Sequence, residues 1–315
     1  MEKYIPQKVK RFGLKLVAKA KLISLPGLDS MPIYNVALFF WKSIYDGAIT
    51  TRASAIAFSF FLALFPAIIF IFTLIPYIPI TNFQTELFLL IQNVLPEGAF
   101  NTIQLTVEDI INRRNGGWLS VGFFMALIFS TNGIASLMSA FDASVHDFER
   151  RNWLNQRMIS IVLLAILVVL VGLGVSLIVG GQWVLDYLVS HEILQSNLTY
   201  YLIWMGKWLV TVGIFFFSIS FVYYYAPAKR TRWRFISAGG TLAAVLCLIT
   251  SLGFSFYINN FGQYNKLYGS IGTILVVLLW LYFNAIALLI GFELNASINQ
   301  ARQLPRTKGI GHLHV

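Results

Sequence analysis

Three charged side chains stand at the ends of long hydrophobic stretches, where an ionic group is unfavourable unless it has a partner. Arg52 opens one stretch, and Asp142 and Glu293 close two others. An ion pair of Arg52 with Glu293 or with Asp142 would neutralise charge and fix the helix ends, and we favour the Arg52–Glu293 pair. Two interpretations stay open: these residues are structural anchors, or they form a gate or a contact with lipid headgroups.

Four further residues are candidates because their chemistry is unusual in apolar surroundings. Lys207 lies near the start of a hydrophobic stretch, where it either extends to the outer lipid headgroups or binds an anionic substrate. Asn132 and Asn284 lie deeper, and they either hydrogen-bond between helices or face a polar central cavity. Pro66 cannot donate a helical hydrogen bond, so we expect a kink there and an end to the helix near Pro76.

The sequence contains no constellation typical of catalysis or of a cofactor site. The four histidines are scattered over loops and the C-terminal tail, and metalloprotease, nucleophile-elbow, P-loop and dinucleotide motifs are missing. Cys247 is the one cysteine, and its apolar surroundings predict a small buried side chain. We therefore expect no catalytic residue, no metal and no cofactor.

The composition indicates that lipid surrounds most of the chain. Of 315 residues, 57% are hydrophobic and 11% are charged, whereas soluble domains carry about 25% charged residues. A helix of roughly 20 apolar residues crosses a bilayer, so we predict an all-α polytopic membrane protein. The six transmembrane helices are predicted at 53–78, 118–140, 158–184, 201–225, 236–258 and 270–292.

The lysines and arginines are distributed unequally between the two sides of these spans. They gather in residues 1–52, in the loops after the second and fourth spans, and in the tail. Because positively charged loops stay in the cytoplasm, both termini are predicted to be cytoplasmic. This topology explains the net charge of +10, so we expect no nucleic acid partner. The expected partners are membrane lipids and an amphipathic small-molecule substrate, and the oligomeric state stays open.

Two segments outside the spans carry helical patterns. In 33–50 the apolar residues share one face, which predicts an amphipathic helix at the membrane interface. Short helices on the outer face are predicted within 81–117. The predicted domains are a basic cytoplasmic N-terminal segment (1–32), a six-span membrane domain (33–298) and a cytoplasmic tail (299–315).

The third span carries small residues at a spacing that suits close helix contact. Gly172, Ser176 and Gly180 repeat every four residues, and small residues let two membrane helices approach each other. The sequence therefore allows a close contact along this face, although such spacing is common in membrane helices.

Several parts of the sequence resemble the signatures of a known family. Residues 51–66 read TRASAIAFSFFLALFP, in which a basic residue precedes small residues, aromatics and Leu-Phe-Pro. The other matching parts are Tyr225 with Pro227, then YGSIG at 268–272, LWLY at 279–282 and GFELNA at 291–296. Over about residues 35–300 the chain resembles the YihY/BrkB family of virulence factors, once labelled ribonuclease BN. One departure is Asp142, where the family often has asparagine.

The resemblance implies a six-span protein of the bacterial inner membrane and delivers no settled activity. Our leading hypothesis is a transporter or flippase-like protein for a lipid or another amphipathic envelope molecule. The alternative is a structural or regulatory membrane protein without transport. The ribonuclease label fits poorly, because phosphodiester cleavage usually needs metal ligands or a positioned acid–base pair, and we find neither in the sequence. We therefore do not expect an enzyme.

Overall fold

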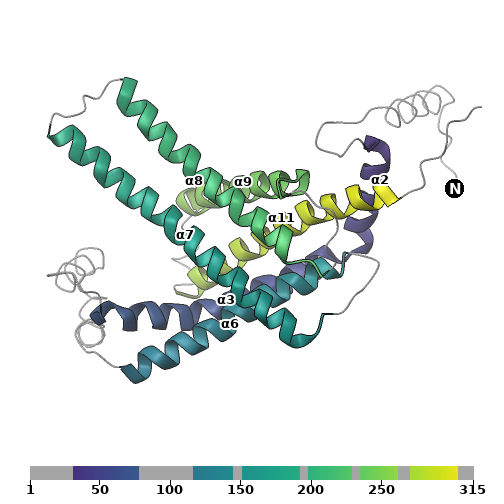
Figure 1. The fold of residues 1–315 in the computed structure, drawn as a ribbon, viewed down its shortest axis with the longest axis horizontal. Helices are drawn as coiled ribbons and strands as arrows, with labels where there is room; N and C mark the ends of the chain where they lie inside the picture. The colour runs from purple at the N-terminus through teal and green to yellow at the C-terminus, as the bar shows by residue number, and fades with distance from the viewer. Residues whose placement is uncertain are drawn as a thin grey trace, which may run out of the picture.

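The part of the chain described by the computed structural model consists of helices and contains no β-strand. It covers residues 31–77, 116–144, 151–191, 198–228, 235–261 and 270–303. Six helices are long and apolar enough to cross a membrane (Figure 1). They are α3 (Ile49–Leu74), α6 (Gly116–Asp142), α7 (Trp153–Ser190), α8 (Leu198–Tyr225), α9 (Ala238–Phe261) and α11 (Ser270–Gln303). The predicted all-α architecture with six spans is confirmed.

The last helix extends well beyond its predicted end. α11 continues past residue 292 to Gln303, so Glu293 lies inside the helix and does not close it. The helix continues because Leu294, Ile298 and Ala301 keep an apolar face at helical spacing, and this face packs against neighbouring residues. The first residues of the segment predicted as a tail therefore belong to α11.

α7 is also longer than its predicted span of 158–184. It has 38 residues, which at 1.5 Å per residue gives a length of about 57 Å. This exceeds the bilayer's hydrocarbon core of about 30 Å. α7 must therefore tilt in the membrane or project from it.

α3 passes through Pro66 as one continuous helix. Helices in a membrane tolerate proline where neighbouring groups compensate for the missing hydrogen bond. The helix ends at Leu74 and is followed by the short 3₁₀-helix η1 (Ile75–Tyr77), which contains Pro76. The predicted end near Pro76 is thus present, while the kink at Pro66 stays a prediction.

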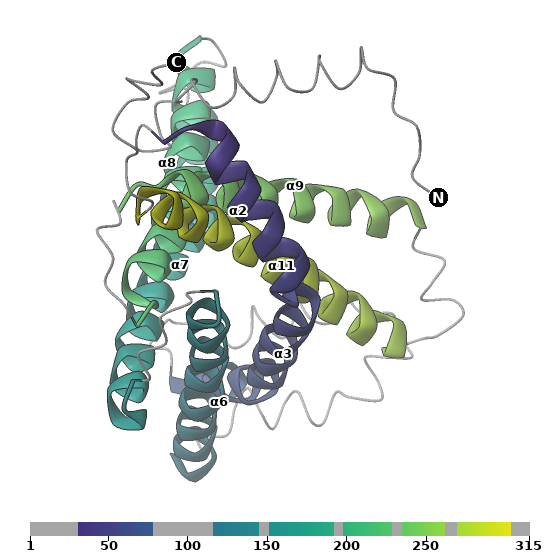
Figure 2. The ribbon, with the colours of Figure 1, turned by 90° about the vertical axis from the view of Figure 1, so that its right-hand side faces the viewer.

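α2 (Ile33–Asp46) forms within the segment predicted as an interfacial helix. Val36 is buried in one cluster with Ile298 and Ala301 of α11, and Figure 2 shows α2 lying across the C-terminal part of α11. Trp41 and Tyr45 of α2 are exposed. One face of α2 therefore packs on the bundle and another is free; its location at a membrane surface stays a prediction.

The packed core lies at one end of the bundle, which we call the Arg52 end. Because the spans alternate in direction, this end combines the N-terminal parts of α3, α7 and α9 with the C-terminal parts of α6, α8 and α11. The buried residues of the larger hydrophobic cluster fall within 49–56, 134–141, 219–226, 243–247 and 285–292, together with Leu163 of α7. All six helices are therefore held together at the Arg52 end.

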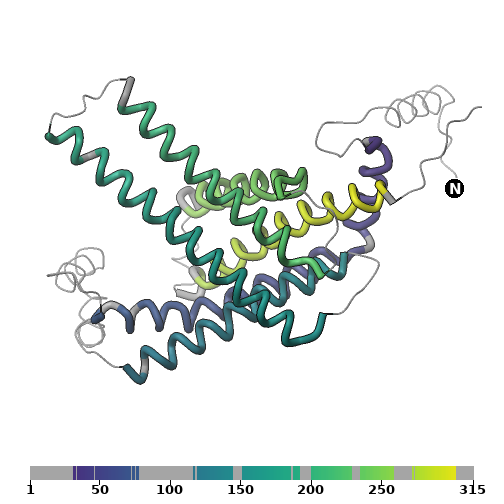
Figure 3. The backbone as a smooth tube through the Cα atoms, in the orientation of Figure 1, coloured from purple at the N-terminus to yellow at the C-terminus, as the bar shows by residue number. Residues whose placement is uncertain are grey.

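Toward the opposite end, the hairpin of α7 and α8 diverges from α3 and α6, as the smooth trace in Figure 3 also shows. Most large apolar side chains in this part of the hairpin are exposed, among them Val179 and Leu209. The hairpin is thus attached to the other described helices mainly through the Arg52 end. The outer helices predicted within 81–117 fall almost entirely outside the described residues, as does the N-terminal segment 1–30.

Candidate functional site

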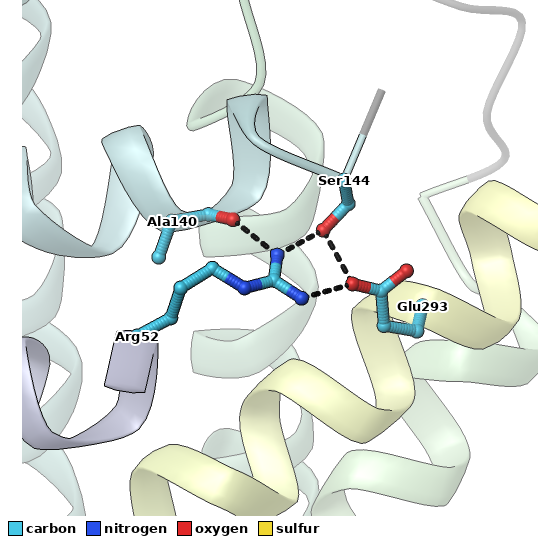
Figure 4. Close-up of polar contacts among 4 residues, drawn as sticks. All are labelled: Arg52, Ala140, Ser144 and Glu293. Carbon is cyan, nitrogen blue, oxygen red and sulfur yellow. Dashed lines mark hydrogen bonds and ion pairs between the residues drawn. The ribbon is translucent and has the colours of Figure 1, made fainter. Parts of the chain in front are cut away.

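An arginine, a serine and a glutamate from three separate parts of the chain meet at the Arg52 end (Figure 4). Nη2 of Arg52 in α3 lies 2.5 Å from Oε1 of Glu293 in α11. Nη1 of Arg52 donates to the carbonyl of Ala140 at 2.8 Å and to the hydroxyl of Ser144 at 2.6 Å. The Ser144 hydroxyl donates to Oε1 of Glu293 at 2.7 Å. The predicted Arg52–Glu293 pair is thus present, and it joins α3, α11 and the end of α6.

This ion pair is almost completely removed from solvent. The Glu293 side chain is 1% exposed and the Arg52 side chain 12%. Burial of a charge is unfavourable unless the group is paired and hydrogen-bonded, and each partner meets this need for the other. Oε2 of Glu293, however, is buried without a hydrogen-bond partner among the described residues. The carboxylate therefore keeps one unused acceptor.

Glu293 also lines a pocket of about 260 Å³ between α2, the end of α6 and α11. In Figure 4 its Oε2 points away from Arg52. The other lining residues are Phe39, Lys42, Ser43, Gly47, Ala143, Ser144 and Gln300. The pocket thus combines a carboxylate, an ammonium group, two hydroxyls and an amide with one aromatic wall.

The turn between α2 and α3 leaves room for the Arg52 guanidinium. A Cβ at Gly47 would lie 2.9 Å from Nη2 of Arg52 and 2.2 Å from the Ser43 carbonyl oxygen. The next residue, Ala48, has φ of 45°, a left-handed conformation that is unfavourable for a residue with a Cβ. Gly47 therefore has a steric reason to be glycine, and the turn is shaped around the ion pair.

Asp142 has a backbone N–H group as its partner, whereas the alternative ion pair would have joined it to Arg52. Its Oδ1 accepts the backbone N–H of Ala228 at 2.8 Å, in the turn after α8. Arg151 donates to the carbonyls of Ala226 and Pro227 in the same turn. The alternative Arg52–Asp142 pair is therefore wrong: Asp142 ends α6 on the side of α8, and Arg52 instead contacts Ala140.

Replacement of Asp142 by asparagine is expected to change stability little, because the amide oxygen still accepts the N–H of Ala228. Asp142→Ala leaves that partly buried N–H without its partner and is expected to lower the free energy of unfolding by about 1–3 kcal/mol. Titration of the purified variants with SDS measures both values. An equal loss for the asparagine and alanine variants would show that the carboxylate charge matters, and not its role as an acceptor.

The two asparagine candidates lie apart from the ion pair. Oδ1 of Asn132 in α6 accepts from Nη1 of Arg157 in α7 at 2.7 Å, so Asn132 does connect two helices. Nδ2 of Asn284 donates to the carbonyl of Trp280 in its own helix at 2.8 Å. This side-chain hydrogen bond of Asn284 is therefore local, since a carbonyl four residues earlier is within reach on the same face of α11.

Lys207 does not extend freely toward the outer side. Its side chain is 9% exposed, and its Nζ donates to Oε1 of Gln182 in α7 at 2.8 Å. Gly181 makes room for it, because a Cβ there would lie 2.9 Å from Cδ of Lys207. Lys207 thus forms a hydrogen bond within the α7/α8 hairpin, and its reach to lipid headgroups stays a prediction.

An aromatic cluster beside the ion pair was not anticipated from the sequence. The rings of Phe141 and Phe292 stack with centroids 4.0 Å apart, and Tyr223 meets both edge-on. The Tyr223 hydroxyl donates to the Leu288 carbonyl. Phe292 precedes Glu293 in the GFELNA motif, so the motif pointed to one member of this cluster. No sequence pattern pointed to its partners, Phe141 on α6 and Tyr223 on α8.

Other residues of the GFELNA motif hold α9 against α11. Oδ1 of Asn295 accepts the backbone N–H of Gly239 at 2.8 Å, and its Nδ2 donates to the Ser237 hydroxyl at 2.8 Å. Free N–H groups at the start of a helix need such acceptors. Gly291 lies where the backbones of the two helices approach each other closely. The motif therefore combines the buried carboxylate with the contacts that position it.

The chemistry available at this site is recognition of polar and ionic groups. Within the described ranges, no three His, Cys, Asp or Glu side chains are grouped so that they could hold a metal ion. Glu293 uses Oε1 for Arg52 and Ser144, while its Oε2 is buried without a hydrogen-bond partner among the described residues, and the residue lines the pocket.

Comparison with known proteins agrees with the sequence signatures and the six helices. A family model described as "Virulence factor BrkB" matches residues 40–311. The "Putative ribonuclease-like protein YfkH" of Bacillus subtilis is 30% identical over 269 residues, which are 85% of this chain and 96% of that protein. A UPF0761 membrane protein of Tolumonas auensis is 27% identical, with 85% and 86% of the two chains covered.

A UPF0761 membrane protein of Xanthomonas campestris is 24% identical over 85% of this chain and 61% of its own length. No solved structure matches. The ribonuclease-like wording belongs to the name of the Bacillus protein, whereas the other two names describe membrane proteins. Since the family model covers most of the chain and agrees with its six apolar helices, the protein belongs to the virulence factor BrkB family of multi-pass membrane proteins.

Proposed function

We propose that this protein is a transporter or flippase-like protein for a lipid or another amphipathic envelope molecule. The observation that carries the proposal is the position of the packed core. It is concentrated at the Arg52 end, while the α7/α8 hairpin diverges from α3 and α6 at the other end. A transporter closes one side while the other is open, and helix groups move relative to each other between the two states. The arrangement fits a state closed at the Arg52 end.

The proposed location is the bacterial inner membrane, with both termini in the cytoplasm. The distribution of lysines and arginines supports this orientation. The Arg52 end would then face the cytoplasm, and the Arg52–Glu293 pair would help to close that side. An ion pair between separate helices can break and re-form as the helices move, which is the property that a gate requires.

Reconstitution of the purified protein in liposomes with fluorescent lipids tests this proposal. We expect labelled lipid to cross faster than in protein-free liposomes. Glu293→Gln removes the charge while it keeps the shape of the side chain, and it is expected to change the rate by about tenfold, the equivalent of about 1.4 kcal/mol. A changed rate together with wild-type folding would identify the pair as a gate. Loss of folding in this variant would identify it as an anchor.

A suitable control for reconstitution is Gly253→Ala, because a Cβ at Gly253 would have no neighbour within 4 Å among the described residues. This variant is expected to transport at the wild-type rate. If rates match those of empty liposomes across a broad panel of lipids and other amphipathic molecules, the transport proposal fails. That result would favour the structural or regulatory alternative.

A further inference from the structure

We propose that the pocket beside Glu293 binds the headgroup of a phospholipid that carries a primary ammonium group as well as its phosphate. The inference rests on the proposed function in one respect, because it takes the bound lipid to be the transported molecule. It is argued from the unused carboxylate oxygen, from the charges around the pocket, and from the face of α2 beside it.

The unused oxygen of Glu293 calls for a hydrogen-bond donor. Oε1 already accepts from Arg52 and Ser144, whereas Oε2 is buried and has no partner among the described residues. Buried polar atoms are rarely left unpaired in native structures. A ligand ammonium that enters the pocket would donate a charge-assisted hydrogen bond to this oxygen.

The other polar groups of the pocket suit a phosphate. Lys42 supplies a positive charge, and Ser43 and Gln300 can supply hydrogen-bond donors, while the hydroxyl of Ser144 already donates to Glu293. A bare metal cation would be repelled by both Lys42 and Arg52. A simple anion would leave Oε2 of Glu293 without a donor. A headgroup that carries both an ammonium and a phosphate satisfies the two sets of groups together.

The neighbouring face of α2 indicates that the headgroup belongs to a lipid. Leu38, Trp41 and Tyr45 are 51%, 58% and 82% exposed on α2, while Phe39 lines the pocket and Lys42 carries the charge. Exposed aromatic and aliphatic side chains beside a lysine are typical of a helix at the headgroup level. A pocket of about 260 Å³ accommodates a headgroup and leaves the acyl chains outside, along α2.

Calorimetric titration of the purified full-length protein in detergent tests this assignment with short-chain lipids. We expect dihexanoyl phosphatidylethanolamine to bind about tenfold more tightly than dihexanoyl phosphatidylcholine, whose quaternary ammonium has no hydrogen to donate. Lys42→Gln is expected to weaken binding of phosphatidylethanolamine by about tenfold. Arg302→Gln removes a positive charge from the end of α11 outside the pocket lining and is expected to bind like the wild type.

Two results would overturn the inference. One is equal affinity for the two headgroups, and the other is an unchanged affinity in Lys42→Gln. Equal binding of soluble phosphoethanolamine and the short-chain lipid would overturn the assignment to a lipid. The outcomes also separate the two proposals: selective binding without transport in liposomes refutes only the proposed function, and transport without headgroup selectivity refutes only this inference.

Discussion

Replacement of Arg52 by alanine is expected to lower the free energy of unfolding by about 3–5 kcal/mol, the usual effect of removing one partner from a buried ion pair. The reason is that Glu293, 1% exposed, would remain as an uncompensated charge. The Ala140 carbonyl and the Ser144 hydroxyl would also lose the donor that Arg52 provides. Titration with SDS in mixed micelles, followed by tryptophan fluorescence, measures the loss.

Arg157→Ala is the matched control for this prediction. Arg157 also extends from a transmembrane helix, but it donates its hydrogen bond to an exposed acceptor on Asn132. Its removal is expected to lower stability by about 1 kcal/mol or less. An equal loss in the two arginine variants would contradict the view that burial of Glu293 makes the Arg52 variant so unstable.

The double variant Arg52→Met with Glu293→Leu separates stability from function. It leaves no unpaired charge, and apolar replacements of a buried pair are often neutral or stabilising. We therefore expect it to recover most of the stability lost in Arg52→Ala. A folded double variant that no longer transports lipid would identify the pair as part of a gate, whereas full transport would leave it the role of an anchor.

The Arg52–Glu293 pair could be predicted from the sequence because membrane topology restricts the choice of partners. Each residue lies at an end of a hydrophobic stretch, and the distribution of positive loops places both ends on one side. An unpaired charge is unfavourable there, so opposite charges on the same side are expected to meet. The same reasoning left Asp142 as an alternative partner, since topology gives the depth of a residue but not its neighbours.

The partners in loops and turns could not be predicted, because no periodicity fixes their positions. Ser144 follows the end of α6, and its contact with Glu293 depends on the path of the chain after that helix. The bond of Asp142 to Ala228 depends likewise on the turn after α8. The pocket beside Glu293 requires the packing of α2 on α11, which the apolar face of α2 allowed but did not specify.

Small residues show the same limit of sequence patterns. Gly172 and Gly180 have the spacing typical of close helix contact, yet a Cβ at either would have no neighbour within 4 Å among the described residues. The close contact is formed by Gly239 and Gly291, which belong to different helices and share no local repeat. Only the crossing of α9 and α11 reveals that these two glycines face each other.

Gly291→Ala is expected to be among the most destabilising single-methyl substitutions in the chain. A Cβ at Gly291 would lie 2.4 Å from the Gly239 carbonyl oxygen and 2.7 Å from both Cβ of Ala243 and Oη of Tyr223. Two of these three neighbours are a backbone atom and a Cβ, so they can give way only if the helices separate. Overpacking typically lowers stability by about 1–3 kcal/mol, occasionally more, and we expect the upper end of that range in an SDS titration.

Gly253→Ala, on the same helix as Gly239, supplies the control because its Cβ would meet no described neighbour within 4 Å. It is expected to be neutral or slightly stabilising, since alanine favours helix more than glycine does. A wild-type value for Gly291→Ala would mean that α9 and α11 are not packed as closely as the structure places them.

The double variant Gly239→Ala with Gly291→Ala provides a sharper test of the same crossing. A Cβ at Gly239 would lie 2.0 Å from the Gly291 carbonyl oxygen, so each methyl group forces the same two helices apart. Once α9 and α11 have separated to admit one methyl group, the second needs little further movement. Neighbouring sites of this kind are not additive, and the loss in the double variant is therefore expected to be clearly smaller than the sum of the two single losses. Simple additivity would show that the glycines act at independent contacts. Because Glu293 lies two residues beyond Gly291 on α11, a separation of these helices would also move the carboxylate away from Arg52 and weaken the closure proposed for this end.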